Sequence, residues 1–197
     1  MHQRDRGSGL DLARISVSPR VVDAGLWSPQ YSLHKFYEHR GRVGKAGRQG
    51  LPMDYLVENF ELIESPLKFD GNCLLNEGIN ELWTLVTGTG ATMFNNANAN
   101  TGVGDSATAE DATQTGLQAA TNKLYKAMDT SYPTYGSSQK AIWRSTFGST
   151  EANFAWQEIT VSNTNADTGK NLNRKVQDMG TKAAGSTWIP TLEVTIT

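Results

Sequence analysis

The stretch from Asn72 to Ala109 constrains the fold most, because it combines an amphipathic helix, a glycine-rich reversal and a short polar strand. The helix is predicted at about 72–88. Its apolar residues recur at i, i+4, i+7, i+8 and i+11, which places them on one stripe. A helix with one apolar stripe needs a partner surface, and the candidate in this chain is the β-rich C-terminal half. The stripe consists of Leu75, Ile79, Leu82, Trp83 and Val86.

Several residues suggest how this helix begins, ends and packs. Asn72 is expected to cap the first turn by accepting a backbone N–H, and Gly88 to end the helix in a left-handed conformation. Gly78 lies inside the helix, where glycine costs about 1 kcal/mol relative to alanine. The sequence therefore predicts that another segment packs close to Gly78. Glu77 and Glu81 lie on the polar face, where we interpret them as solvated charges.

Short strand candidates follow the helix and are separated by turn residues. The last is the clearest, because Leu192, Val194 and Ile196 alternate with polar residues. Several short strands at nearly regular spacing are typical of an antiparallel sandwich or partial barrel. The candidates are 100–104, 123–130, 140–147, 154–162, 171–178 and 187–197.

These patterns together predict a mainly β fold: an antiparallel β-sandwich or partial barrel with one packed amphipathic helix and an extended N-terminal arm. The arm is placed at 1–50 and the β-rich globular body at 51–197. Trp83 on the helix and Trp156 on a central strand are expected to anchor one core. The predicted core anchors are Leu75, Ile79, Leu82, Trp83, Val86, Trp156, Leu192, Val194 and Ile196.

Charge is distributed unevenly between the predicted arm and body. Residues 1–50 contain nine Lys and Arg and four Asp and Glu, a net charge of +5, whereas the remainder carries −7. Such an arm can dock by charge onto a copy of the same chain or onto an acidic partner. Nucleic acid is the alternative partner, which we consider unlikely because few aromatic residues accompany the basic ones. The predicted interface residues are Trp27, Tyr31, Phe36, Tyr37, Arg40, Arg42, Lys45 and Arg48.

The sequence offers little catalytic chemistry. All three histidines, His2, His34 and His39, lie in the predicted arm, so a Ser-His-Asp or Cys-His arrangement requires the arm to fold back onto the body. The glycine-rich runs lack the residues of phosphate-binding or dinucleotide-binding motifs. The single cysteine, Cys73, excludes an internal disulfide. We therefore expect no enzyme, no catalytic residue and no cofactor.

Metal and sugar sites are weaker alternatives. His34 and His39, with Glu38 beside His39, could ligate a metal ion. Because they lie in a glycine-rich loop, we interpret them as solvated loop residues. Oxygen ligands for calcium are available from Asp105, Glu110 and Asp111 with nearby asparagines, yet their spacing differs from that of an EF-hand loop. We therefore expect no metal. The five tryptophans suit a sugar-stacking platform but are more often core and interface anchors.

Three carboxylates are available for a glycosidase-like pair: Glu77, Glu81 and Glu158. The first two lie one turn apart on the polar helix face. Glu158 lies in a strand that is apolar on both sides, where a half-buried carboxylate needs an arginine partner. Arg174 and Arg144 are the candidates. We find neither an N-terminal signal peptide nor a run of about 20 apolar residues that would span a membrane.

Five runs within 72–197 are distinctive: LLNEGINELWTLVTGTGATMFNNANANTGVGDS, LQAATNK, TFGSTEANFAWQEITVSN, LNRKV and GTKAAGSTWIPTLEVTIT. In this order they resemble small virion structural proteins of tailed bacteriophages and the attachment domains of phage tail fibres. The resemblance covers about two-thirds of the chain and carries no catalytic residue. It implies a role in the particle, on the head, at the neck or on the tail.

The resemblance and the charge pattern lead to one expected function. The protein is expected to be a structural component of a tailed-phage virion, such as a capsid decoration or head-tail connector protein, assembled in the cytoplasm of the host bacterium. Its arm would bind neighbouring capsid, neck or tail subunits, and copies of the chain would form a homo-oligomer. The alternative is a tail-associated, carbohydrate-recognising host-binding module. A cell-wall-degrading enzyme is the weakest candidate, because the sequence offers no credible acid-base pair.

Overall fold

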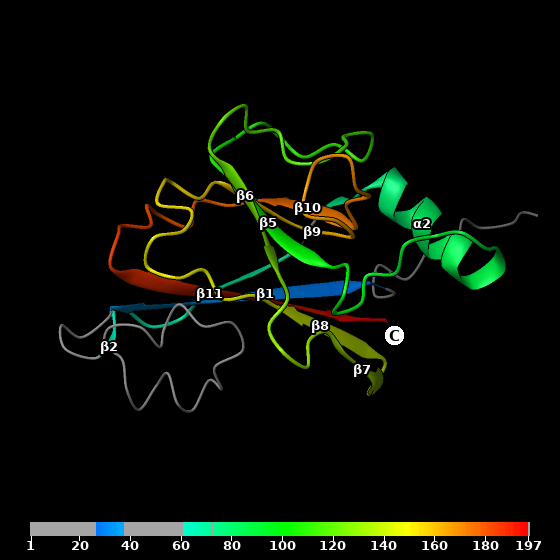
Figure 1. The fold of residues 1–197 in the computed structure, drawn as a ribbon, viewed down its shortest axis with the longest axis horizontal. Helices are drawn as coiled ribbons and strands as arrows, with labels where there is room; N and C mark the ends of the chain where they lie inside the picture. The colour runs from blue at the N-terminus through cyan, green and yellow to red at the C-terminus, as the bar shows by residue number, and fades with distance from the viewer. Residues whose placement is uncertain (1–26, 38–60, 72, 197) are drawn as a thin grey trace, which may run out of the picture.

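The computed structural model of the protein describes residues 27–37, 61–71 and 73–196. Two antiparallel β-sheets pack face to face as a sandwich, and a helix lies at one end of it (Figure 1). The predicted mainly β fold is therefore confirmed, in its sandwich form.

The first sheet has the order β2-β1-β11-β8-β7, and β3 also pairs with β1. The long strands β1 and β11 form its centre, in a register that runs from Ser28 opposite Thr195 to Tyr37 opposite Ser186. β2 pairs with the C-terminal end of β1 and β3 with its N-terminal half. The strands are β1 (Ser28–Tyr37), β2 (Glu61–Leu62), β3 (Leu67–Asp70), β7 (Thr134–Ser137), β8 (Lys140–Arg144) and β11 (Ser186–Thr195).

The second sheet has the order β4-β10-β9-β5-β6. Its centre, β9 and β5, is buried along its whole length, as expected for strands covered on both faces. All six strand candidates that follow the helix in the sequence are present, most of them shorter than predicted. The strands of this sheet are β4 (Cys73–Leu74), β5 (Asn100–Gly104), β6 (Lys123–Ala127), β9 (Glu158–Ser162) and β10 (Asn173–Val176).

Aromatic side chains fill part of the space between the sheets. The ring centroid of Trp156 lies 4.8 Å from that of Phe147 and 4.9 Å from that of Trp188, both in edge-to-face arrangements. All three side chains are buried. Edge-to-face pairs of this kind add about 0.5–1.5 kcal/mol beyond the area they bury. Leu75, Leu192 and Val194 are buried as well.

The N-terminal arm needs a correction. Residues 28–37, which the sequence analysis assigned to the arm at 1–50, form β1, a central strand of the first sheet. Tyr31 and Phe36 are buried in the body, so their assignment as arm interface residues was wrong. The sequence did not indicate a buried strand here because it contains Lys35. In the structure the Lys35 side chain is buried: its ammonium lies over the ring of Trp188, 4.6 Å from the centroid, and also pairs with Glu64. Residues 1–26 and 38–50 of the predicted arm lie outside the described residues.

The helix, α2, spans Asn76–Thr87. Its N-cap residue is Leu75, which makes no side-chain capping bond, and Asn72 lies outside the described residues. Gly88 has φ −128°, which is extended backbone, so the left-handed end predicted there is wrong. A Cβ on Gly78 would lie 2.6 Å from the backbone of Asn171 and Leu172. The predicted close packing at Gly78 is therefore confirmed.

Three predicted core anchors are exposed. The exposed fractions are 62% for Trp83, 76% for Val86 and 53% for Ile196, so their assignment to the core was wrong. On α2 the reason is rotational: the helix packs through Gly78, and this turns Trp83 and Val86 away from the sheet. Ile196 lies just beyond the end of β11. Ile79 and Leu82 are partly buried.

Candidate functional site

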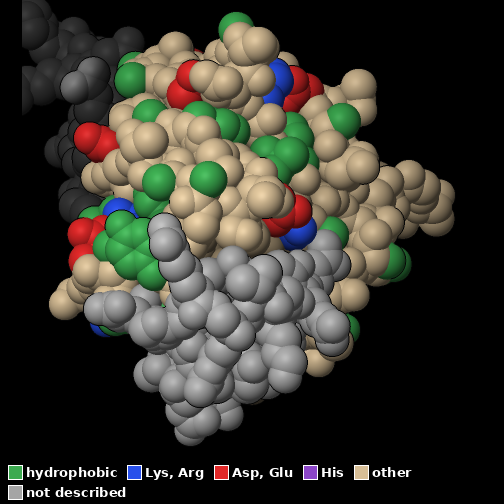
Figure 2. All heavy atoms as spheres, turned by 60° about the vertical axis from the view of Figure 1, so that its left-hand side comes forward, with side chains coloured by type: hydrophobic (Ala, Val, Ile, Leu, Met, Phe, Trp, Pro, Cys, Tyr) green, Lys and Arg blue, Asp and Glu red, His purple; other side chains and the backbone are tan. Residues whose placement is uncertain are grey.

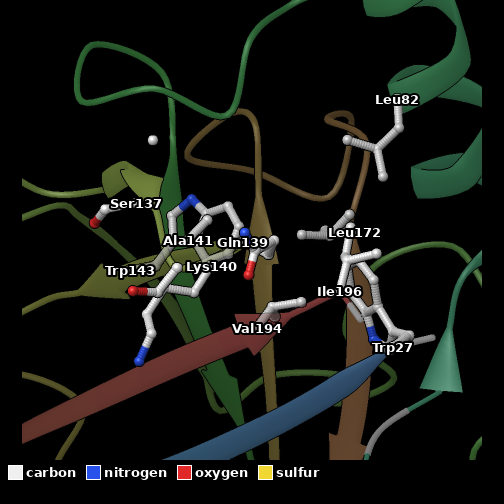
Figure 3. Close-up of a pocket in the computed structure, with 12 residues that line it drawn as sticks. Trp27, Leu82, Ser137, Gln139, Lys140, Ala141, Trp143, Leu172, Val194 and Ile196 are labelled. Atoms are coloured by element: carbon white, nitrogen blue, oxygen red, sulfur yellow. The ribbon is translucent and has the colours of Figure 1, made fainter. Parts of the chain in front are cut away.

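An apolar groove lies beside α2 and the turn between β7 and β8 (Figure 3). Its volume is about 690 Å³, within the range of about 300–1,000 Å³ typical of ligand pockets. Its wall is formed by the first sheet, by α2, by the turn between β7 and β8, and by Leu172, which directly precedes β10. The lining residues are Trp27, Leu82, Gly136, Ser137, Ser138, Gln139, Lys140, Ala141, Trp143, Leu172, Val194 and Ile196.

The floor of the groove is set by strand register. Val194 on β11 lies opposite Ala141 on β8, and Leu192 lies opposite Trp143. Since alternate residues of a strand point to the same face, Val194 and Trp143 present a continuous apolar surface. The Trp143 indole is fixed, because its Nε1 donates to the Phe94 carbonyl oxygen at 3.1 Å.

A tight turn forms one lip of the groove. Ser138 and Gln139 have φ values of 53° and 51°, and they connect two strands that pair at Ser137 and Lys140. Two central residues with positive φ are the mark of a type I′ hairpin turn. The Ile196 backbone N–H donates to the Gln139 carbonyl oxygen at 3.0 Å. This hydrogen bond holds Ile196, which directly follows β11, against the turn.

The helix supplies the opposite wall. The backbone contact at Gly78 brings α2 against the segment that contains Leu172, and Leu82 then points from α2 toward the groove (Figure 3). Among the described lining residues Lys140 alone is charged, and its Nζ lies 2.6 Å from Glu193 Oε1. The groove therefore offers apolar contact and little unpaired charge, which suits an apolar occupant.

The carboxylates considered for catalysis hold the fold together. Glu158 and Arg174 are fully buried, and their Oε2 and Nε atoms lie 2.6 Å apart. The same carboxylate accepts backbone N–H bonds from Gln118 at 3.0 Å and Ala119 at 2.7 Å. The predicted arginine partner is thus confirmed as Arg174. The pair fastens the loop between β5 and β6 onto β9 and β10.

Glu77 and Glu81 are not solvated charges, which corrects the sequence interpretation. Glu77 Oε1 accepts from the backbone N–H of Asn171 at 2.9 Å and from its side-chain amide at 3.2 Å. Glu81 Oε1 accepts from the backbone N–H of Thr92 at 2.7 Å and from Asn163 Nδ2 at 3.0 Å. Both carboxylates therefore fasten α2 to the neighbouring loops.

A second buried ion pair was not foreseen from the sequence. Asp129 Oδ2 lies 2.7 Å from Arg144 Nε and accepts the Thr146 hydroxyl at 3.0 Å. The Arg144 guanidinium lies over the ring of Tyr132, 4.3 Å from its centroid. A planar guanidinium suits this combined pairing and stacking. The pair fixes the segment after β6 against the end of β8.

The acidic residues of the β5–β6 loop accept hydrogen bonds from within the loop and from β10. Asp105 accepts from Asn122 at 2.7 Å, and Glu110 accepts from the backbone N–H of Val176 at 2.5 Å. Asp111 accepts both the backbone N–H and the hydroxyl of Thr113, which lowers the pKa of the Asp111 carboxyl. No group of three or more His, Cys, Asp or Glu that could hold a metal ion occurs among the described residues.

His34 and Tyr125 also have shifted pKa values. His34 on β1 has its pKa lowered from 6.5 by burial and by the positive charges of Lys68 and Arg144, while Glu38 and His39 lie outside the described residues. Burial raises the pKa of Tyr125, whose hydroxyl donates to Asp167 at 2.6 Å. Neither side chain lines the apolar groove.

The predicted interface residues that the structure describes do not form one surface. Trp27 lines the groove, Tyr31 and Phe36 are buried, and the exposed fraction of Tyr37 is 51%. The four basic residues, Arg40, Arg42, Lys45 and Arg48, lie outside the described residues. The sequence analysis missed the groove, because its lining comes from segments that are distant in the chain.

The opposite end of the sandwich looks different. Figure 2 shows a face on which hydrophobic side chains are scattered among polar ones, and Lys and Arg lie beside Asp and Glu. Interspersed charges of both signs on such a face serve mainly solubility.

No helix in the described part of the chain is long and apolar enough to cross a membrane. Comparisons of the chain with protein-family models, with curated proteins and with solved structures found no match.

Proposed function

We propose that this protein is a non-enzymatic structural component of a tailed-phage virion that binds neighbouring subunits and stabilises the particle. The observation that carries the proposal is that buried and partly buried charged groups hold segments of the fold together. Glu158 with Arg174, Asp129 with Arg144, and the helix carboxylates Glu77 and Glu81 are each engaged in fastening segments of the fold. Groups engaged in this way build a rigid scaffold for association.

The virion setting comes from the resemblance of 72–197 to small phage structural proteins. The geometry is compatible with such a role, because a sandwich with tightly fastened loops loses little further entropy when it is built into an assembly. The excess of positive charge in 1–50 supplies the contact with neighbours. We propose Arg40, Arg42, Lys45 and Arg48 as its basic residues, facing acidic capsid, neck or tail subunits.

The test is a mass-resolved count of this chain in purified particles. Hundreds of copies support a capsid decoration protein, and six or twelve support a neck or tail ring. Replacing the four basic residues by Ser should weaken incorporation in the same way as raised salt, because both treatments remove charge attraction. Absence of the chain from purified particles would contradict the proposal.

A tail-associated, carbohydrate-recognising module is the second candidate. Two exposed aromatic side chains favour it: Trp83, with an exposed fraction of 62%, and Tyr135, with 77%. Exposed aromatic rings are suited to stack on sugar faces. A polar cleft of about 440 Å³ between β1, β3 and β11 is lined by Gln30, Lys68 and Glu193. These side chains can form hydrogen bonds with the hydroxyl groups of a sugar.

This candidate is tested by binding of the purified protein to host surface polysaccharide. Loss of binding on Trp83→Ala or Tyr135→Ala, with retained folding, would favour the host-binding module. Retained binding in both variants, or no binding by the unmodified protein, would count against it.

A further inference from the structure

We propose that the apolar groove is a peptide-binding site whose occupant is the segment 10–22 of the same chain. The first observation is position. Trp27 lines the groove and directly precedes β1, so the 26 residues before it enter the described fold at the groove itself. A segment that begins there reaches the groove without crossing the rest of the molecule.

The second observation is chemical complementarity. Four apolar residues of the segment form two pairs with members two positions apart, Leu10 with Leu12 and Ile15 with Val17. This spacing puts each pair on one side of an extended chain. The groove presents Trp143, Leu172 and Val194 with Leu82 and Ile196 at its margins. Its volume of about 690 Å³ has room for several aliphatic side chains.

The third observation is an edge strand beside the groove. Gly136 and Ser137 belong to β7 and also line the groove. Among the described residues β7 pairs only with β8, so its other edge presents backbone N–H and C=O groups. An extended segment next to the groove can therefore add main-chain hydrogen bonds to its apolar contacts, the usual mode of strand addition.

The segment of the same chain is favoured over other occupants by concentration. A short flexible linker holds a tethered segment at an effective concentration of about millimolar. A second copy at micromolar concentration competes poorly with it. A sugar is disfavoured, because the charged lining group, Lys140, is already paired with Glu193. This inference concerns the isolated chain and does not depend on the virion proposal.

The experiment is disulfide trapping in the full-length chain. In a Cys73→Ser background, Leu12→Cys is combined with Ala141→Cys in the groove. The matched control combines Leu12→Cys with Ala107→Cys, an exposed alanine in the loop after β5. That loop lies on the far side of the second sheet from β8 (Figure 1). We expect an intrachain disulfide of monomer mass that forms at least tenfold faster than in the control, at a rate independent of protein concentration.

Equal rates for groove and control cysteines would overturn the proposal. A product of dimer mass whose rate rises with concentration would overturn it too, and would assign the groove to a second copy. Both tests assume folded variants, which far-ultraviolet circular dichroism and tryptophan fluorescence check. Ser137→Cys, at an exposed groove position, replaces Ala141→Cys if that variant does not fold.

A second set of variants separates apolar docking from charge attraction. Ile15→Asp with Val17→Asp should lower the trapping rate at least tenfold, since charged groups do not enter an apolar groove. Arg14→Ser with Arg20→Ser should leave the rate within about twofold. The reverse order of effects would overturn the proposal.

Discussion

Replacing Glu158 by glutamine tests how the second sheet is held together. The Glu158 carboxylate is fully buried, lies 2.6 Å from Arg174 Nε, and accepts the backbone N–H groups of Gln118 and Ala119. Glutamine keeps the shape but removes the charge that Arg174 needs, and its NH₂ group faces N–H donors. Removing one partner of a buried ion pair costs about 3–5 kcal/mol, because the other charge stays buried without compensation.

Urea unfolding followed by tryptophan fluorescence measures this cost. For a denaturant slope of about 2 kcal/mol per molar, a loss of about 3–5 kcal/mol lowers the midpoint by about 1.5–2.5 M. That is a large share of the about 5–15 kcal/mol expected for a domain. The matched control is Glu193→Gln, which removes the partly exposed pair with Lys140 and should cost about 1 kcal/mol or less.

The outcome separates a structural carboxylate from a functional one. Equal midpoints for Glu158→Gln and Glu193→Gln would refute the claim that the buried pair fastens the β5–β6 loop. A Glu158→Gln protein of unchanged stability that enters particles but abolishes infection would go further, and would assign this carboxylate to receptor binding or catalysis.

Three further predictions follow from burial, packing and charge. Trp156→Ala should lower the free energy of unfolding by about 3–5 kcal/mol, measured in urea, because the Trp156 side chain is fully buried. Trp83→Ala should lower it by less than about 1 kcal/mol, because the Trp83 side chain is exposed, and equal losses would contradict the packing described. Gly78→Ala should lower the melting temperature despite the higher helix propensity of alanine, since its Cβ would lie 2.6 Å from the Leu172 backbone; a raised melting temperature would contradict that contact. The free energy of unfolding should fall as the pH drops below 6.5, because the pKa of His34 in the folded protein is lowered from that value and the unfolded chain binds the proton more readily. The His34→Gln variant should lose this pH dependence; a variant with the same pH profile as the unmodified protein would contradict the shift.

Strands with a regular apolar alternation were predictable from the sequence, whereas a strand with buried charged residues was not. β11 was recognisable, because in its second half the buried Leu192 and Val194 alternate with partly exposed polar residues. β1 was mistaken for an arm, because it carries Lys35 and His34 in a basic neighbourhood. A lysine becomes compatible with a sheet interior only when a partner such as Glu64 is brought to it, and that partner lies far away in the sequence.

The orientation of the helix could not be obtained from its apolar stripe. The spacing of apolar residues predicts only which face of a helix is the more hydrophobic. In the structure α2 packs through the side that contains Gly78, where the backbones approach most closely. Glu77 and Glu81 add directed hydrogen bonds on that side, and a charge pattern does not distinguish such acceptors from solvated groups. The groove escaped prediction for a similar reason, since it arises only when register, turn and helix position are combined.

The wrongly assigned core anchors themselves point to an association surface. Trp83 and Val86 lie on α2, next to Leu82 in the chain, and Ile196 lines the groove. Figure 1 places α2 and the C-terminal end of β11 at the same end of the sandwich. Exposed apolar groups gathered at one end of a protein mark an interaction site more often than a defect of packing. The apolar pattern in these residues therefore indicates burial by another segment or subunit, so Trp83→Ala should reduce association while leaving the fold intact.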